Sequence, residues 1–89
     1  DEKIIVSGLR LDCFVKELAR TSREIAQKFI KSGNVNLNYE ECKDFDKKIN
    51  ENDIISIRKE GKFKVDSFDG LTKKNKFVVN IKRYSIWYM

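Results

Sequence analysis

The chain has 89 residues, of which 40% are hydrophobic and 37% charged, and its formal net charge is +5. This length predicts one small domain with a shallow core, and no apolar run approaches the roughly 18 residues of a membrane span. With two Cys and no His, the sequence lacks the roughly four ligands of a Cys/His zinc site. We expect no metal or cofactor, and we expect Cys13 and Cys42 to be small buried or half-buried side chains in a reducing cytoplasm.

Charge is distributed unevenly along the chain. Residues 1–33 carry seven basic and five acidic groups, residues 40–53 carry three and six, and residues 58–83 carry nine and three. A basic front and back around an acidic middle predict a polarised surface that suits a polyanion. On charge alone, a role in solubility only stays open. The start of the sequence lacks the pattern of a signal peptide and an initiator Met, so we expect a piece of a longer protein.

The first third of the chain predicts a short strand and two short helices. Residues 4–6 form an apolar run, and from Leu11 apolar residues recur at i, i+3, i+4 and i+7, which indicates a helix with one buried face. Thr21 and Glu24 fit a capping box at the start of a second helix, and Ser22 is an alternative cap.

The second helix is expected to bury one side and expose another. The apolar positions expected on its buried side are Ile25, Ala26, Phe29 and Ile30. Arg23, Gln27 and Lys31 recur at i, i+4 and i+8 on an exposed stripe. Gly33 follows the last turn and suits the left-handed position that ends many helices.

The rest of the chain alternates apolar and polar residues between turn signals, which is typical of short antiparallel strands. The expected strands are 34–38, 42–45, 55–58, 62–66 and 77–82, and the expected turns are 39–41, 50–53, 69–70 and 73–76. Two helices followed by four or five short strands predict an α+β domain with the helices on one side of a small antiparallel sheet. Nothing indicates a boundary within residues 1–89.

The ordered motifs resemble the S-four RNA-binding domain, named after a primary rRNA-binding protein of the small ribosomal subunit. That family has R-L-D, then S-R, a small residue, an aliphatic residue, G-x-V-x-V-N and D-x-I-x-V. The matching positions are Arg10, Leu11, Asp12, Ser22, Arg23, Ala26, Ile30, Gly33, Val35, Leu37, Asn38, Asp53, Ile55 and Ile57. The resemblance covers about residues 9–60 and implies the S-four-like fold with its alpha-L motif. Tyr39 stands where the family usually has Gly, which alters the hairpin turn.

Residues 61–83 are expected to form a C-terminal strand extension, and the stretch EGKFKVDSFDGLTKKNKFVVNIKR from residue 60 to 83 resembles the end of YlmH-type bacterial S-four proteins. This resemblance implies ribosome association, including rescue of stalled large subunits. We therefore expect a cytoplasmic, monomeric module that binds structured rRNA, or tRNA, and has no catalysis of its own. Two alternatives stay open: an RNA-anchoring domain of an enzyme such as a pseudouridine synthase or tRNA synthetase, and a protein-interaction module.

RNA phosphates are bound by cations spaced along a backbone rather than by a catalytic constellation. The predicted RNA-binding residues are Arg10, Lys16, Arg20, Ser22, Arg23, Gln27, Lys28 and Lys31. Arg23 is the strongest candidate because it lies at the positive end of the second helix. Roles without RNA stay open: Ser22 as a cap, Arg10 as a partner of Asp12, and Asp12 as a residue that holds the fold together.

A second RNA patch is predicted in the C-terminal part, against the alternative of a solvated loop. Its candidate residues are Lys73, Lys74 and Lys76. The tail aromatics Tyr84, Trp87 and Tyr88 could stack on bases, pack on the core or contact a further domain. No catalytic residue is predicted, because the sequence has no His base, Gly-rich phosphate loop or nucleophile elbow.

Overall fold

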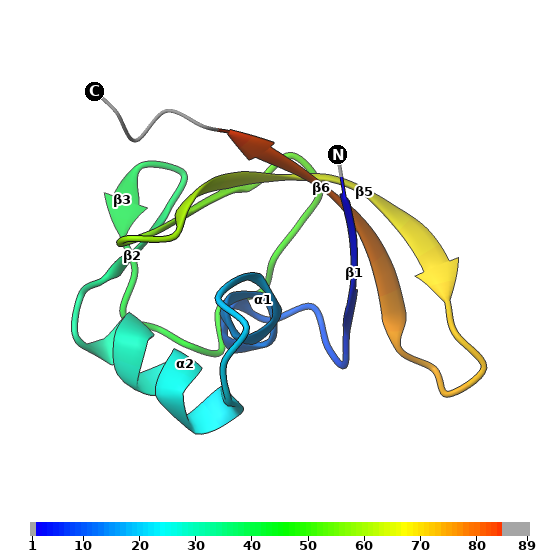
Figure 1. Cartoon of the computed structure of the whole chain (residues 1–89), viewed down its shortest axis with the longest axis horizontal. Coiled ribbons are helices and arrows are strands. Elements are labelled where there is room, and N and C mark those ends of the chain that lie inside the picture. The colour runs from blue at the N-terminus through cyan, green and yellow to red at the C-terminus, as the bar shows by residue number, and fades with distance from the viewer. Residues whose placement is uncertain (1, 85–89) are drawn as a thin grey trace.

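The computed structural model describes residues 2–84 and has two helices and a six-stranded antiparallel sheet (Figure 1). The elements are β1 (Glu2–Val6), α1 (Leu11–Leu18), α2 (Arg23–Lys31), β2 (Val35–Leu37), β3 (Glu40–Glu41), β4 (Ile54–Ile57), β5 (Gly61–Leu71) and β6 (Phe77–Tyr84). The strand order is β1-β6-β5-β4-β2-β3. The α+β prediction is confirmed, with one strand more than the four or five expected. No helix in this part of the chain is long and apolar enough to cross a membrane.

Both helices pack on the same side of the sheet (Figure 1). The core is formed by the apolar side of α1, by Ala26 and Ile30 of α2, and by alternate residues of the strands. Period-2 alternation in the strands therefore places one set of side chains under the helices and the other set on the outer face. Ile25, expected in the core, is 49% exposed, because it lies in the first turn of α2 beyond the buried stripe.

The starts of the two helices are stabilised in different ways. Ser22 is the N-cap of α2, and its hydroxyl accepts a hydrogen bond from the backbone N–H of Ile25 at 3.2 Å, so the capping box of Thr21 and Glu24 was wrong. No side chain caps α1. Instead, residues 45–47 run past its start, and backbone carbonyls there accept from the N–H groups of residues 11 and 12 at 2.9 and 3.1 Å.

The hairpin after β2 turns earlier than the sequence indicated. Leu37 pairs directly with Glu40, and the two residues between them, Asn38 and Tyr39, have φ of +52° and +70°. Positive φ at both central positions is the type I′ geometry that matches strand twist and normally favours Gly. The predicted turn at 39–41 and return strand at 42–45 were therefore wrong, because Tyr39 adopts a conformation that its side chain disfavours.

The long β5–β6 hairpin extends beyond the rest of the sheet. The expected turn at 69–70 was wrong: β5 continues through it with a register shift between Phe68 and Leu71. Gly70, at φ +110°, accommodates that irregularity. The loop instead spans residues 72–76, where the Thr72 hydroxyl accepts from two backbone N–H groups. Gly33 has the expected left-handed conformation at the end of α2, with φ +81°.

Candidate nucleic-acid interface

A buried carboxylate lies at the centre of the two-helix face. Asp12, in the first turn of α1, is 0% exposed. Its Oδ2 accepts from Gln27 Nε2 at 2.9 Å and from Arg23 Nε at 3.3 Å, both on α2. Arg10 approaches from the residue before α1, with Nη2 at 3.5 Å from Oδ2 and Nε at 3.3 Å from Oδ1. Asp12 thus joins the start of α1 to one side of α2, which confirms its expected role in holding the fold together.

The contact between Arg10 Nε and Asp12 Oδ1 is an ion pair by distance without hydrogen-bond alignment, so both buried atoms lack a hydrogen bond within residues 2–84. The Arg10 Nε–Asp12 Oδ1 contact is electrostatic, because both groups are charged and their atoms lie 3.3 Å apart. The Cys13 thiol, which accepts from Arg10 Nη2 at 3.8 Å, raises the pKa of Arg10, and the Asp12 and Asp46 carboxylates add to this. Arg10 is therefore fixed in place as a permanent cation.

The two arginines face Asp12 and solvent at once. The Arg10 side chain is 38% exposed and that of Arg23 is 52% exposed, although both contact a fully buried carboxylate. Arg23 uses Nε for Asp12, and a guanidinium has further N–H donors in a fixed plane. Asp46 also lies 3.9 Å from Arg10, so two guanidinium groups meet two carboxylates here, and the partly exposed arginines still have N–H donors that Asp12 does not use. The site can therefore bind an anion with donors whose orientation is already fixed.

The other predicted RNA-binding residues are spread around this centre. Lys16 pairs with the adjacent Glu17 at 2.9 Å, which reduces its availability. Lys28 and Lys31 are exposed in the last turn of α2, and Lys31 Nζ lies 5.0 Å from the centre of the Phe45 ring. Arg20 is exposed after α1 with φ +53°.

Arg20 lies close enough to β1, an edge strand of the sheet, to affect a carboxylate there. The pKa of Glu2 on β1 is lowered, first by its hydrogen bond from Arg83 and, as the smallest contribution, by Arg20. This influence places Arg20 within electrostatic range of β1. The two-helix face therefore brings Arg10, Arg23 and Gln27 together at Asp12, with Lys28 and Lys31 farther along α2.

Two basic residues of this face were missed because they lie in a segment with acidic net charge. Lys47 and Lys48 are exposed in the segment that passes the start of α1, and Lys48 forms a β-bridge with Arg10. The acidic neighbour Asp46 lies 3.9 Å from Arg10. The acidic net charge of residues 40–53 gave no sign of this arrangement. The signal in the sequence was the apolar residue Ile49, which is fully buried and brings the segment back to the core.

The predicted second patch does not join the two-helix face. Lys73, Lys74 and Lys76 are exposed in the β5–β6 loop, which Figure 1 shows at the far end of the long axis from α2. The tail aromatics Trp87 and Tyr88 lie outside the described residues, whereas Tyr84 ends β6. Cys13 is buried and Cys42 is half-buried, and both are free thiols, as expected.

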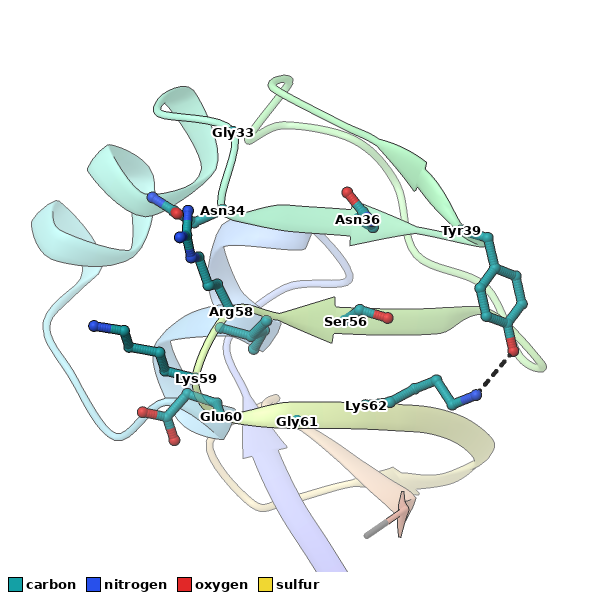
Figure 2. A pocket seen from close by; sticks show the side chains of 11 residues that line it. Gly33, Asn34, Asn36, Tyr39, Ser56, Arg58, Lys59, Glu60, Gly61 and Lys62 are labelled. Carbon is teal, nitrogen blue, oxygen red and sulfur yellow. Dashed lines mark hydrogen bonds between the residues drawn. The ribbon is translucent and has the colours of Figure 1, made fainter. Parts of the chain in front are cut away.

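A hollow of the described surface lies elsewhere, on the outer face of the sheet, and has a volume of about 880 Å³ (Figure 2). We call it the sheet-face hollow. Its walls include Asn34, Asn36, Tyr39, Ser56, Arg58 and Lys62, and none of the eight residues predicted to bind RNA. The alternating polar positions of β2, β4 and β5 marked this face in the sequence as exposed, but nothing there singled it out as a site.

No family model matches the sequence. The chain is 36% identical over 78 residues to a protein of Bacillus subtilis (strain 168) named ribosome-associated protein quality control protein P2. This similarity covers 88% of the chain and 30% of that protein. The chain is thus a homologue, over most of its own length, of a domain-sized part of a ribosome-associated quality control protein.

Proposed function

We propose that this chain is an RNA-binding module of the S-four type that binds structured ribosomal RNA through the two-helix face. The observation that carries the proposal is the Asp12 centre, where a buried carboxylate fixes Arg10 and Arg23 while both remain partly exposed. A buried carboxylate needs charged partners to offset the loss of its hydration, and here both partners also reach solvent, where they can meet a ligand. Fixed guanidinium groups suit phosphate recognition because their donors form a planar fork.

The remaining cations extend this centre into a surface long enough to follow a phosphate backbone. Lys28 and Lys31 continue along α2, and Lys47 and Lys48 continue past the start of α1. Cations on elements that pack rigidly against each other present a fixed spacing. Such a surface favours RNA that is itself folded, since double-stranded RNA is recognised mainly by shape and backbone contacts.

The relative supports the ribosome as the place of action, because its name describes a ribosome-associated protein. The chain spans less than a third of that relative, so we assign it the anchoring to ribosomal RNA and not the relative's whole activity. Bacterial ribosomes would place it in the cytoplasm, and we propose that it acts as a monomer without catalysis. A role as the RNA anchor of an enzyme would use the same face.

The test is co-sedimentation of the chain with separated bacterial ribosomal subunits, followed by titration with the extracted rRNA. Lys28→Glu combined with Lys31→Glu is the informative variant because neither side chain makes an ion pair within residues 2–84. Arg23→Glu is less suitable, since it would place a second carboxylate against buried Asp12 and endanger folding. We expect the double variant to lose most of its rRNA affinity and to flatten the salt dependence by about one to two phosphate contacts.

The same two-charge reversal at Lys73 and Lys74 compares the β5–β6 loop with the two-helix face. We expect a smaller loss there, because that loop lies at the other end of the molecule. Equal losses from both variants would mean that binding follows net charge alone and would contradict the assigned face. Retention of salt-independent subunit binding by the Lys28/Lys31 variant would favour a protein partner instead.

A further inference from the structure

The sheet-face hollow is built from a row of side chains that cross the sheet. Asn36 on β2 pairs with Ser56 on β4, and Ser56 pairs with Lys62 on β5. Their neighbours in sequence are buried on the helix side, so strand alternation places all three on the outer face. Figure 2 shows them between two turns, with Tyr39 at one end of the hollow and Arg58 at the other.

Tyr39 presents an aromatic ring that is fixed at the rim of the hollow. The residue is 63% exposed and lies in the left-handed turn at φ +70°. Lys62 donates a hydrogen bond to its hydroxyl at 3.1 Å, and Lys62 Nζ lies 5.1 Å from the ring centre. An exposed ring in a backbone conformation that favours Gly has a stability cost, and such strain clusters at binding sites. Fixing the ring in advance lowers the entropic cost of stacking on it.

The rest of the lining offers charge and hydrogen-bonding groups. Arg58, Lys59 and Lys62 provide three cations against the single carboxylate of Glu60, and the three cations make no ion pair within residues 2–84. The side chains of Asn36 and Ser56 also have no hydrogen-bond partner in the described part of the chain, although Asn80 and Ser67 farther along the sheet bond to each other. Arg58, Asn36 and Ser56 are therefore available to a ligand, whereas Lys62 contacts the rings of Tyr39 and Tyr84 and would have to share its charge between them and a phosphate.

We propose that the sheet-face hollow binds one or two unpaired nucleotides of an RNA strand. A base would stack on Tyr39, its edge would meet the amide and hydroxyl of Asn36 and Ser56, and its phosphates would face Lys62 and Arg58. Stacking on an aromatic side chain beside cations is how single-stranded RNA is bound without strict sequence preference. The volume of about 880 Å³ falls within the ~300–1,000 Å³ of small-ligand sites.

This inference shares with the proposed function the identity of the ligand as RNA, but it uses the opposite side of the sheet. The two-helix face would hold a folded element, and the sheet-face hollow would hold an unpaired segment. The two assignments can fail separately, because no residue belongs to both.

The test is the affinity of the whole chain for a fluorescent oligouridine of about six nucleotides, within the range of single-strand site sizes. Tyr39→Gly is the informative variant, since Gly accepts the positive φ and removes the ring without straining the turn. We expect its affinity to fall by about 5- to 100-fold, the loss of one base–aromatic stack. Tyr39→Phe is the matched control: it keeps the ring, and we expect affinity within about threefold of the original, because only one exposed hydrogen bond is lost.

A second arm separates the two faces. The measurement is made at about 0.15 M salt, where charges more than ~8 Å apart are largely screened. Under these conditions, the Lys28→Glu and Lys31→Glu double variant should lose its affinity for rRNA and keep its affinity for oligouridine. An oligouridine affinity that is unchanged in Tyr39→Gly, or no oligouridine binding at all, overturns the inference and leaves the rRNA assignment standing. Tyr39-dependent oligouridine binding by a chain that ignores rRNA would support the inference and overturn the proposed function.

Discussion

Replacing Asp12 by Asn is the change that most directly probes the two-helix face. Attraction by net charge and fixation of the two arginines predict opposite effects of this substitution on the affinity for rRNA. Asn has nearly the same shape, so no cavity forms, and the variant gains one unit of net positive charge. If the protein attracted RNA only by its total charge, Asp12→Asn would bind more tightly. If Asp12 acts by fixing Arg10 and Arg23, the more positive variant should bind more weakly.

The stability cost follows from the contacts of Asp12. Its hydrogen bond from Gln27 at 2.9 Å involves a charged acceptor and is worth about 1.5 kcal/mol or somewhat more. Arg10 and Arg23 are 38% and 52% exposed, so solvent screening reduces each ion pair to about 1 kcal/mol or less. We expect the free energy of unfolding to fall by about 2–3 kcal/mol. A domain of this size has roughly 4–13 kcal/mol, so most variant molecules stay folded.

The binding cost follows from lost orientation. Each arginine that must be ordered on binding costs about 0.5–1 kcal/mol, so the affinity for rRNA should fall about 5- to 30-fold. Fluorescence titration with rRNA extracted from large subunits measures this, and urea denaturation confirms folding. Asp46→Asn is the charge-matched control. Its carboxylate is 63% exposed and 3.9 Å from Arg10, so its removal frees that arginine and should leave binding equal or tighter.

The reasoning is refuted if Asp12→Asn is folded and binds rRNA as tightly as the original chain or more tightly. Arg23→Lys gives a second measurement at constant net charge. Lys has one ammonium group in place of a planar fork, so it cannot contact buried Asp12 and an external phosphate with separate nitrogens. We expect this variant also to bind more weakly, and an unchanged affinity would count against the Asp12 centre.

Two further predictions concern stability. Arg83 donates to Glu2 at 2.8 Å and lowers its pKa below the ordinary 4.5, so the pair stabilises the fold above that pH and loses this effect as pH falls through the folded pKa. Glu2→Gln, with both side chains more than a third exposed, should therefore cost less than about 1 kcal/mol at neutral pH, and this cost should shrink as the pH falls below 4.5. Urea denaturation at neutral pH and at a series of pH values below 4.5 checks this, and a cost that does not shrink with falling pH would contradict it. Ser22→Ala should cost about 1 kcal/mol by the loss of the α2 cap, whereas Thr21→Ala should cost almost nothing. A larger loss of thermal stability in Thr21→Ala than in Ser22→Ala would mean that the capping box of Thr21 and Glu24 forms after all.

Periodicity predicted the helices and the core well because both depend on the local pattern of apolar residues. The recurrence from Leu11 placed α1, and alternation placed β2, β4 and β6 within a few residues. The failures occur where the residue type suggests another local structure than the one that the chain adopts. Tyr39 forms half of a type I′ turn, and Gly70 lies within β5 rather than in a turn. Pairing between strands determines the conformation at Tyr39 and at Gly70, and the local sequence around each residue does not reveal that pairing.

The candidate site was predictable as a set of residues and not as an arrangement. The sequence indicated cations on α2 and a structural role for Asp12. It could not show that three side chains from two elements meet on one carboxylate. Nor could it show that Lys47 and Lys48 return to the start of α1, because that return depends on backbone bonds to a distant loop.

A buried carboxylate is an unusual choice for a domain with so small a core. Burying a charge costs several kcal/mol unless partners compensate, and apolar residues of similar volume often stabilise a fold as well or better. Stability alone therefore does not explain Asp12, whose two charged partners remain 38% and 52% exposed. The function we propose explains it, because a buried anion holds both guanidinium groups from beneath while they face solvent. The same reasoning applies to Tyr39, whose unfavourable turn gives the fold nothing that Gly would not give, and whose ring remains turned toward solvent. In both places the chain departs from the most stable choice, and in both it leaves oriented and exposed a side chain that our proposals assign to RNA.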